Sequence, residues 1–108
     1  MNTHIIIITT CPNLEESRTL ARSLVEKKLA ACVQLGAIES VYRFEGKVED
    51  EKEYRLYIKT KRDLFDEVKE FILKHHSYKL PQIVAISIVD GFDKYLQWID
   101  ENTAESIQ

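Results

Sequence analysis

The stretch HIIIITT, residues 4–10, decides how the rest of this sequence is read. All six residues from Ile5 to Thr10 are β-branched, and the turn residues Cys11-Pro12-Asn13 end the run. A short continuous apolar run of this kind is typical of a central β-strand that is covered on at least one face. We therefore expect a strand from His4 to Thr10 in the middle of a sheet.

A helix is predicted directly after this strand, over Leu14–Leu29. Asn13 is a plausible N-cap, and Glu16 stands at the position that would complete a capping box. Lys27 and Lys28 fall in the last expected turn, where the helix dipole favours cations. One apolar stripe recurs at intervals of three and four residues, which indicates a single buried face: Leu20, Ala21, Leu24, Val25 and Leu29.

Two long extended segments follow, Ala31–Phe44 and Val48–Thr60, and the turn Glu45-Gly46-Lys47 joins them into a hairpin. The alternation of apolar residues shifts near Gly36, which predicts a bulge or bend. The acidic run from Glu49 to Glu53 indicates a solvated face, so we expect the hairpin to project beyond the body as an arm.

The remaining sequence predicts a second helix over Lys61–His75 with Thr60 as its N-cap, a strand over Gln82–Val89 and a short helix over Phe92–Asn102. The order βαββαβ indicates an α+β, ferredoxin-like sandwich with a short C-terminal helix, built as a single domain of residues 1–108. Both long helices would cover one sheet face. The other face keeps apolar residues, so we expect a second copy of the chain to cover it.

Charge and composition exclude several classes of function. The 108 residues carry 18 acidic and 15 basic side chains, a net charge of −3, which gives no basic field for nucleic acid or an anionic membrane. No basic segment precedes the first strand, so we expect no secretory signal and a cytoplasmic location. Cys11 and Cys32 are separated by about the length of the first helix, ~24 Å, which is too far for a disulfide.

A histidine pair is the sharpest polar feature. Right-handed crossovers would bring Cys11 to the same end of the sheet as His75 and His76. Imidazole and thiol groups are preferred ligands for copper and zinc, so these residues form a candidate metal site. The alternative is that one histidine caps the helix C-terminus while the other is solvated or hydrogen-bonded.

A second candidate is a polar pocket formed by Cys32, Lys59 and Tyr78. Tyr42 and Trp98 belong to a set of aromatic residues that could line a ligand site, although such residues more often form core or interface. The alternative for Lys59 and Cys32 is that they are a structural lysine and a core cysteine, with no ligand. The sequence has no nucleophile–base motif, phosphate loop or HExxH motif, so we expect no enzymatic activity.

Several motifs together resemble one family. They are LAACV at 29–33, YRFEGKV at 42–48, KT at 59–60, HHSYKLPQI at 75–83 and YLQWI at 95–99. In order and separation these segments look like the CutA divalent-cation tolerance proteins over residues 4–100. The resemblance implies a ferredoxin-like subunit assembled as a homotrimer, similar to the nitrogen-regulatory signal proteins, with a role in tolerance of copper and other divalent cations.

The resemblance also implies site residues. It places a metal site at His75 and His76 with a cysteine late in the first strand, a position that falls at Thr9 or Cys11 here. Phe44 replaces the family's usual tryptophan, and Gln82 replaces a usual glutamate. The alternative function is a trimeric signalling or scaffold module that binds a small molecule in inter-subunit clefts lined by Cys32, Tyr42, Lys59, Tyr78 and Trp98.

Overall fold

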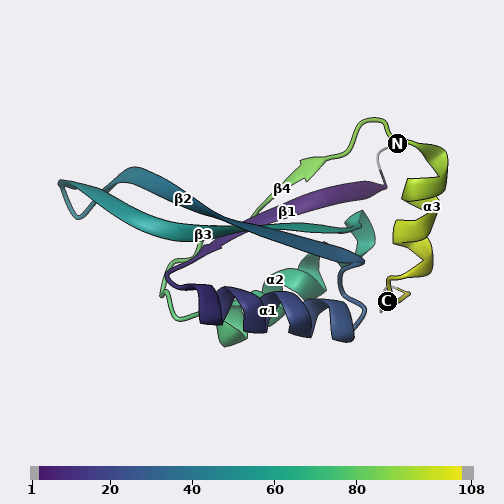
Figure 1. The fold of residues 1–108 in the computed structure, drawn as a ribbon, viewed down its shortest axis with the longest axis horizontal. Helices are drawn as coiled ribbons and strands as arrows, with labels where there is room; N and C mark the ends of the chain where they lie inside the picture. Colours follow the sequence, from purple (N-terminus) through teal and green to yellow (C-terminus); the bar gives the residue numbers. More distant parts are fainter. Residues whose placement is uncertain (1–2, 106–108) are drawn as a thin grey trace.

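The computed structural model of the protein describes residues 3–105. Its elements are β1 (His4–Cys11), α1 (Leu14–Glu26), β2 (Cys32–Phe44), β3 (Lys47–Lys61), the 3₁₀ turn η1 (Arg62–Leu64), α2 (Phe65–His75), β4 (Val84–Ser87) and α3 (Asp93–Glu101). The strands form one antiparallel sheet in the order β2-β3-β1-β4. Helices α1 and α2 lie against one face of it, and α3 packs near its end (Figure 1). The predicted ferredoxin-like α+β fold is confirmed.

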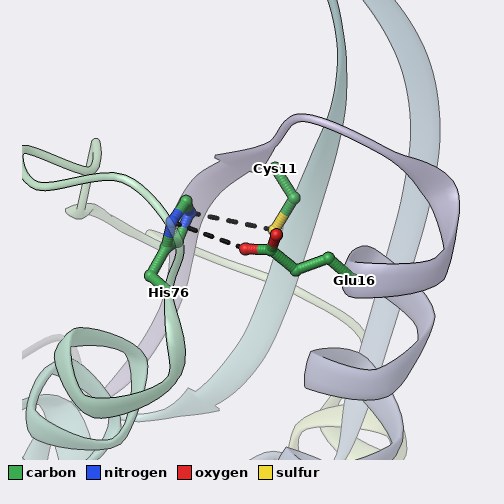
Figure 2. A group of neighbouring side chains, drawn as sticks. All are labelled: Cys11, Glu16 and His76. Carbon is green, nitrogen blue, oxygen red and sulfur yellow. Dashed lines mark hydrogen bonds and ion pairs between the residues drawn. The ribbon is translucent and has the colours of Figure 1, made fainter.

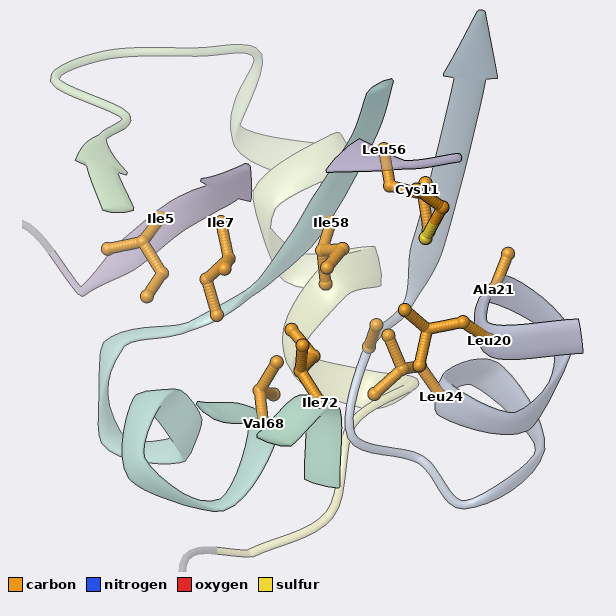
Figure 3. Packing of buried hydrophobic residues seen from close by; sticks show 11 residues of the cluster. Ile5, Ile7, Cys11, Leu20, Ala21, Leu24, Leu56, Ile58, Val68 and Ile72 are labelled. Carbon is orange, nitrogen blue, oxygen red and sulfur yellow. The ribbon is translucent and has the colours of Figure 1, made fainter. Parts of the chain in front are cut away.

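The core lies between the sheet and the two long helices. Ile7 of β1 pairs with Ile58 of β3, so the two side chains share the helix-facing side of the sheet. They meet Leu24 of α1 and the α2 residues Val68 and Ile72, and all five are fully buried (Figure 3). The packing of these side chains against both helices holds β1 in the middle of the sheet, as the apolar run predicted.

The hairpin extends well beyond β1. Strand β3 pairs with β1 from Lys61 to Tyr54, and residues 38–53 of β2 and β3 then continue as a two-stranded arm (Figure 1). The register of β2 and β3 is unbroken from the Cys32–Lys59 pair to the Phe44–Lys47 pair. The bulge expected at Gly36 is therefore wrong, but the shift in alternation is observed, because the half-buried positions change from Val33 and Leu35 to Ile38 and Ser40.

The turn of the hairpin is formed by Glu45 and Gly46. Their φ angles are +50° and +81°, and a two-residue loop with both central residues in this left-handed region matches the twist of the flanking strands. Glycine adopts this conformation without a steric cost, whereas Glu45 does so with one.

Helix α1 ends three residues earlier than the apolar stripe predicted. Lys28 has a φ of +60°, and the backbone N–H groups of Lys28 and Leu29 donate to the carbonyls of Val25 and Leu24. This is a Schellman motif, which closes the helix before Leu29. The two lysines thus follow the helix rather than occupying its last turn.

The start of the second helix also differs from the prediction. The chain passes through η1 before α2 begins at Phe65, and Thr60 is not its N-cap. The Thr60 hydroxyl instead donates to the Leu29 carbonyl at 2.7 Å. Strand β4 is shorter than expected, and α3 has nearly the predicted bounds.

The sheet face opposite α1 and α2 is called the open face below. Its apolar residues include Val84 and Ile86 on β4 and Tyr42 and Phe44 on the arm, with exposed fractions of 46, 54, 40 and 50%. As predicted, the open face carries large apolar side chains at the surface of the chain. Within residues 3–105, no helix has the length and hydropathy needed to cross a membrane.

Candidate metal centre

Three potential ligands converge at the end of β1. The Cys11 sulfur, a Glu16 carboxylate oxygen and a His76 ring nitrogen all lie within 4.8 Å of one another. Figure 2 shows them entering from three elements: the end of β1, the first turn of α1 and the residue that follows α2. The prediction that Cys11 and the histidine pair lie at one end of the sheet is confirmed for Cys11 and His76, whose Sγ and Nε2 atoms are 3.8 Å apart.

Glu16 reaches the group because of how α1 begins. The Asn13 side chain accepts a hydrogen bond from the Glu16 N–H at 2.8 Å, so Asn13 is the predicted N-cap. The Glu16 carboxylate accepts from the Ser77 hydroxyl at 2.8 Å and from the Ser77 N–H at 3.1 Å. It does not complete a capping box with Asn13, because it bridges to the segment after α2.

Hydrogen bonds define the tautomer of His76. Its Nδ1 atom accepts from the Tyr78 N–H at 3.0 Å, so the ring proton is on Nε2, which donates to the Thr10 carbonyl at 2.7 Å. The side chain is fully buried, and Glu16 Oε2 lies 3.6 Å from Nδ1. The neutral imidazole therefore has one ring lone pair, on Nδ1, and the Tyr78 N–H occupies it.

Cys11 is a neutral thiol in this arrangement. It is fully buried, and burial raises its pKa to about 11, with a further rise from the Glu16 and Glu53 carboxylates against an opposing hydrogen bond with Ser17. Cys11 must lose its proton to act as a thiolate ligand, so metal binding there would release a proton. Cys11 and Cys32 are both free, as predicted.

Thr9 was the other position at which the family cysteine could fall. It lies on the same face of β1 as Cys11 and is fully buried. Its hydroxyl has no hydrogen-bond partner within the part of the chain that the structure describes. The sulfur of Cys11, and not the Thr9 side chain, lies beside His76.

His75 points elsewhere. Its Nδ1 atom bonds to the Phe71 carbonyl at 2.9 Å, and its ring stacks on the Phe71 ring at a centroid distance of 4.2 Å. Among residues 3–105, it is not part of the group formed by Cys11, Glu16 and His76. The two adjacent histidines thus have different surroundings, one on the surface of α2 and one in the interior.

The donor atoms fit a divalent metal ion in type and in spacing. A thiolate, an imidazole and a carboxylate are ligands that zinc and copper accept. Two adjustments would be needed, since Cys11 must ionise and His76 must free a lone pair. Cys11, Glu16 and His76 are therefore the residues that would hold such an ion.

The predicted inter-subunit cleft residues fall into two places within one subunit. Cys32 and Lys59 pair across the sheet, and the Lys59 ammonium contacts the Tyr95 hydroxyl at 3.2 Å, beside a Tyr95–Trp98 ring stack. Tyr42 and Tyr78 instead line a cleft of about 810 Å³. One subunit does not bring all five residues together, so the predicted pocket of Cys32, Lys59 and Tyr78 is wrong for a single chain.

Sequence reasoning missed two acidic residues, Glu16 and Glu53. The run from Glu49 to Glu53 was expected to be solvated, yet Glu53 is 8% exposed and accepts a hydrogen bond from the Tyr78 hydroxyl at 2.9 Å. Burial raises the pKa of Tyr78 well above its usual value, and this hydrogen bond adds to the rise. The capping-box position of Glu16 was noticed in the sequence, but it indicated a role at the start of the helix and not a contact with His76.

Known proteins resemble this chain closely. A CutA divalent-cation tolerance protein from Archaeoglobus fulgidus is 44% identical over 98 residues, which are 91% of this chain and 96% of that one. The chloroplastic CutA of Arabidopsis thaliana is 43% identical over 92% of this chain. Among solved structures, CutA1 from Oryza sativa has a TM-score of 0.94 and 42% identity, covering 97% of both chains.

The relatives differ in length and in location. This chain spans 55% of the Arabidopsis protein and 58% of a chloroplastic Oryza relative. The cytoplasmic location expected from the start of the sequence is wrong as an inference. These plant relatives are named as chloroplastic, and the solved Archaeoglobus structure is described as a periplasmic protein, so the location varies among relatives.

A family description covers nearly the same residues as the sequence motifs. The model of the CutA1 divalent ion tolerance protein family matches residues 5–102. The Archaeoglobus structure, at a TM-score of 0.90 and 43% identity, covers 92% of this chain and 97% of its own. Sequence and fold agree over the whole βαββαβ unit, and the chain belongs to the CutA1 divalent ion tolerance family.

Proposed function

We propose that this protein is a non-catalytic, homotrimeric divalent-cation tolerance protein that binds copper or another divalent ion through Cys11, Glu16 and His76. The observation that carries the proposal is the convergence of a thiol, a carboxylate and an imidazole within 4.8 Å. Family membership supports the role in cation tolerance. The buried position of Cys11 and His76 favours a site with restricted access to water.

The chemistry of the three ligands favours late transition metals. Thiolate and imidazole bind zinc and copper better than magnesium or calcium, and affinities rise toward copper in the Irving–Williams order. Copper binding alone would therefore not identify the physiological ion. Zinc and cobalt are the more informative probes, because a cobalt–thiolate bond gives an absorption band that reports directly on Cys11.

The adjacent histidines provide a matched test of the site. Zn²⁺ and Co²⁺ would be titrated anaerobically into the reduced wild type and into the His76→Ala, Cys11→Ser and His75→Ala variants. We expect the first two variants to lose at least about tenfold in affinity, whereas His75→Ala changes it little. An unchanged affinity in His76→Ala, or a loss confined to His75→Ala, would contradict the proposed ligand set.

The trimer is proposed from the open face. Val84 and Ile86 are each about half exposed there, and burying such residues against another copy would stabilise the small subunit. Sedimentation velocity, which measures the mass of the assembly, tests this proposal.

A second candidate function rests on the cleft of about 810 Å³. Two tyrosines and the nearly buried Glu53 line it, among both apolar and polar side chains, and concave pockets of this size are usual ligand sites. The protein would then be a signalling or scaffold module that binds a small molecule. A thermal-shift screen of small molecules tests this, and absence of any stabilisation sensitive to Tyr78→Phe would count against it.

A further inference from the structure

The candidate ligands Glu16 and His76 both hold the segment 76–78 that follows α2. Both oxygens of the Glu16 carboxylate accept hydrogen bonds from Ser77. The Nδ1 atom of His76 accepts the Tyr78 N–H. On His76, the Nδ1 lone pair that a metal ion would use is thus the one that now holds the Tyr78 N–H, whereas each Glu16 oxygen keeps a further lone pair.

His76 cannot ligate a metal ion and keep its bond to Tyr78. In the present tautomer the Nδ1 lone pair is the available one, and using it displaces the Tyr78 N–H. If His76 were to ligate through Nε2, the ring proton would reside on Nδ1, which would then be a donor facing another donor. Either mode leaves the Tyr78 N–H without its acceptor.

Tyr78 connects this segment to the cleft. Its hydroxyl donates to Glu53 on β3 at 2.9 Å, and its ring lies against the His76 ring at a centroid distance of 4.9 Å. Tyr78, Ser77 and Glu53 all line the cleft of about 810 Å³, together with Tyr42 on the arm. One residue therefore contacts the candidate metal ligands at its backbone and the cleft at its side chain.

We infer that metal binding at Cys11, Glu16 and His76 releases Tyr78, breaks the Tyr78–Glu53 hydrogen bond and reshapes the cleft. The inference rests on the proposed function and adds a regulatory consequence to it. The metal-free protein holds Tyr78 closed against Glu53, and the metal-loaded protein frees it. By linkage, whatever stabilises the closed Tyr78 weakens metal binding by the same factor.

Hydrogen exchange of the wild type provides the direct test. Amide exchange of Ser77 and Tyr78 would be measured by mass spectrometry or NMR, in the metal-free protein and at saturating Zn²⁺. We expect the Tyr78 amide to exchange at least about threefold faster when Zn²⁺ is bound, since its acceptor is lost. Exchange in the α2 amides serves as the internal reference and should not accelerate.

A pair of tyrosine variants tests the linkage. Tyr78→Phe removes the hydroxyl that bonds to Glu53, so release costs less, and the affinity for Zn²⁺ should rise about three- to tenfold. Tyr42→Phe alters another tyrosine that lines the same cleft, and it should leave the affinity unchanged.

The outcomes separate the two proposals. If Zn²⁺ binds in a manner dependent on Cys11 and His76, yet Tyr78→Phe leaves the affinity unchanged and Tyr78 exchange does not accelerate, the release mechanism is overturned and the metal site stands. If the wild type binds no metal, or binds it independently of Cys11 and His76, the site and the release mechanism are both overturned.

Discussion

Thr9 and Thr60 are buried threonines on the helix-facing side of the sheet, and their hydroxyls have opposite surroundings. The Thr60 hydroxyl donates to the Leu29 carbonyl, whereas the Thr9 hydroxyl has no partner among residues 3–105. A buried polar group without a hydrogen bond costs about 1–3 kcal/mol. The same Thr→Val change should therefore have opposite signs at the two positions.

Thr9→Val should raise the free energy of unfolding by about 1 kcal/mol, because valine has nearly the shape of threonine and carries no polar atom. Thr60→Val should lower it by about 1–2 kcal/mol, since the Leu29 carbonyl loses its donor. Urea unfolding at one fixed protein concentration measures both. If Thr9→Val is as destabilising as Thr60→Val, the Thr9 hydroxyl has a partner after all.

Cys11 should make stability depend on pH in the alkaline range. Its thiol has a pKa of about 11 in the folded protein against 9.0 for a free cysteine. The folded state therefore holds the proton more tightly, and the contribution to stability is complete below pH 9 and is lost as the pH rises toward 11. The total loss is roughly 2–3 kcal/mol.

Comparison with Cys11→Ala isolates this effect from other titrating groups. The difference in unfolding free energy between wild type and variant should shrink by about 2 kcal/mol between about pH 8 and about pH 10.5. A difference that is the same at both pH values would mean that the folded thiol ionises as easily as the unfolded one.

Residue identity predicted part of the candidate site. Cys11 and His76 were found because thiol and imidazole are recognisable ligands and the topology places them at one end. His75 and His76 look equivalent in the sequence, and only the exit from α2 separates them, since the chain becomes extended at His76. Glu16 was missed because a carboxylate in a first helical turn has a sufficient local explanation.

At the scale of single elements, helix ends were the least predictable feature. The apolar stripe that suggested a helix to Leu29 continues past the Schellman motif at Lys28, because Leu29 packs against the core from outside the helix. Strands β1, β2 and β3 were predicted to within one residue at each end, and β4 is two residues shorter at each end than predicted. The β-branched runs of the strands and the Glu-Gly turn of the hairpin are local signals. The length of β4 depends instead on how far it pairs with β1.

The conformation of Lys28 leads to a prediction for α1. Its φ of +60° is unfavourable for a residue with a side chain, and glycine is the usual residue at this position of a Schellman motif. Lys28→Gly should stabilise the protein by about 0.5–1 kcal/mol.

Lys27→Gly is the matched control, because Lys27 has a φ of −84° and gains nothing from glycine. It should destabilise by about 0.5–1 kcal/mol through the greater entropy of the unfolded chain. Thermal unfolding of the two variants gives the comparison. Equal shifts of the melting temperature in one direction would exclude strain at Lys28.

For the whole molecule, the order of elements predicted the sheet and the layer of helices. It did not predict what covers the open face. Residues 38–53 form an arm with no β1 pairing in the described register, and the open face beside it is apolar. A subunit of 12.6 kDa buries a limited core. These features are the basis for the proposed coupling between stability and assembly.

The proposed assembly predicts that a substitution to lysine has different effects on the open face of the sheet and on the helix layer. Ile86 lies on the open face and Leu73 lies on α2, and both are about half exposed, at 54 and 50%. In an isolated subunit, a lysine at either position would cost little. If other copies cover the open face, Ile86→Lys places a charge in an apolar interface, while Leu73→Lys stays at the surface.

Sedimentation velocity at micromolar concentration measures the difference. The wild type and Leu73→Lys should sediment at roughly three times the subunit mass, because the open face is buried between copies. Ile86→Lys should dissociate toward a single subunit, and its melting temperature should fall on dilution more steeply than that of the wild type. A wild type that sediments as a folded single subunit would remove the basis for the trimer. Equal behaviour of the two lysine variants would place the interface elsewhere than on the open face.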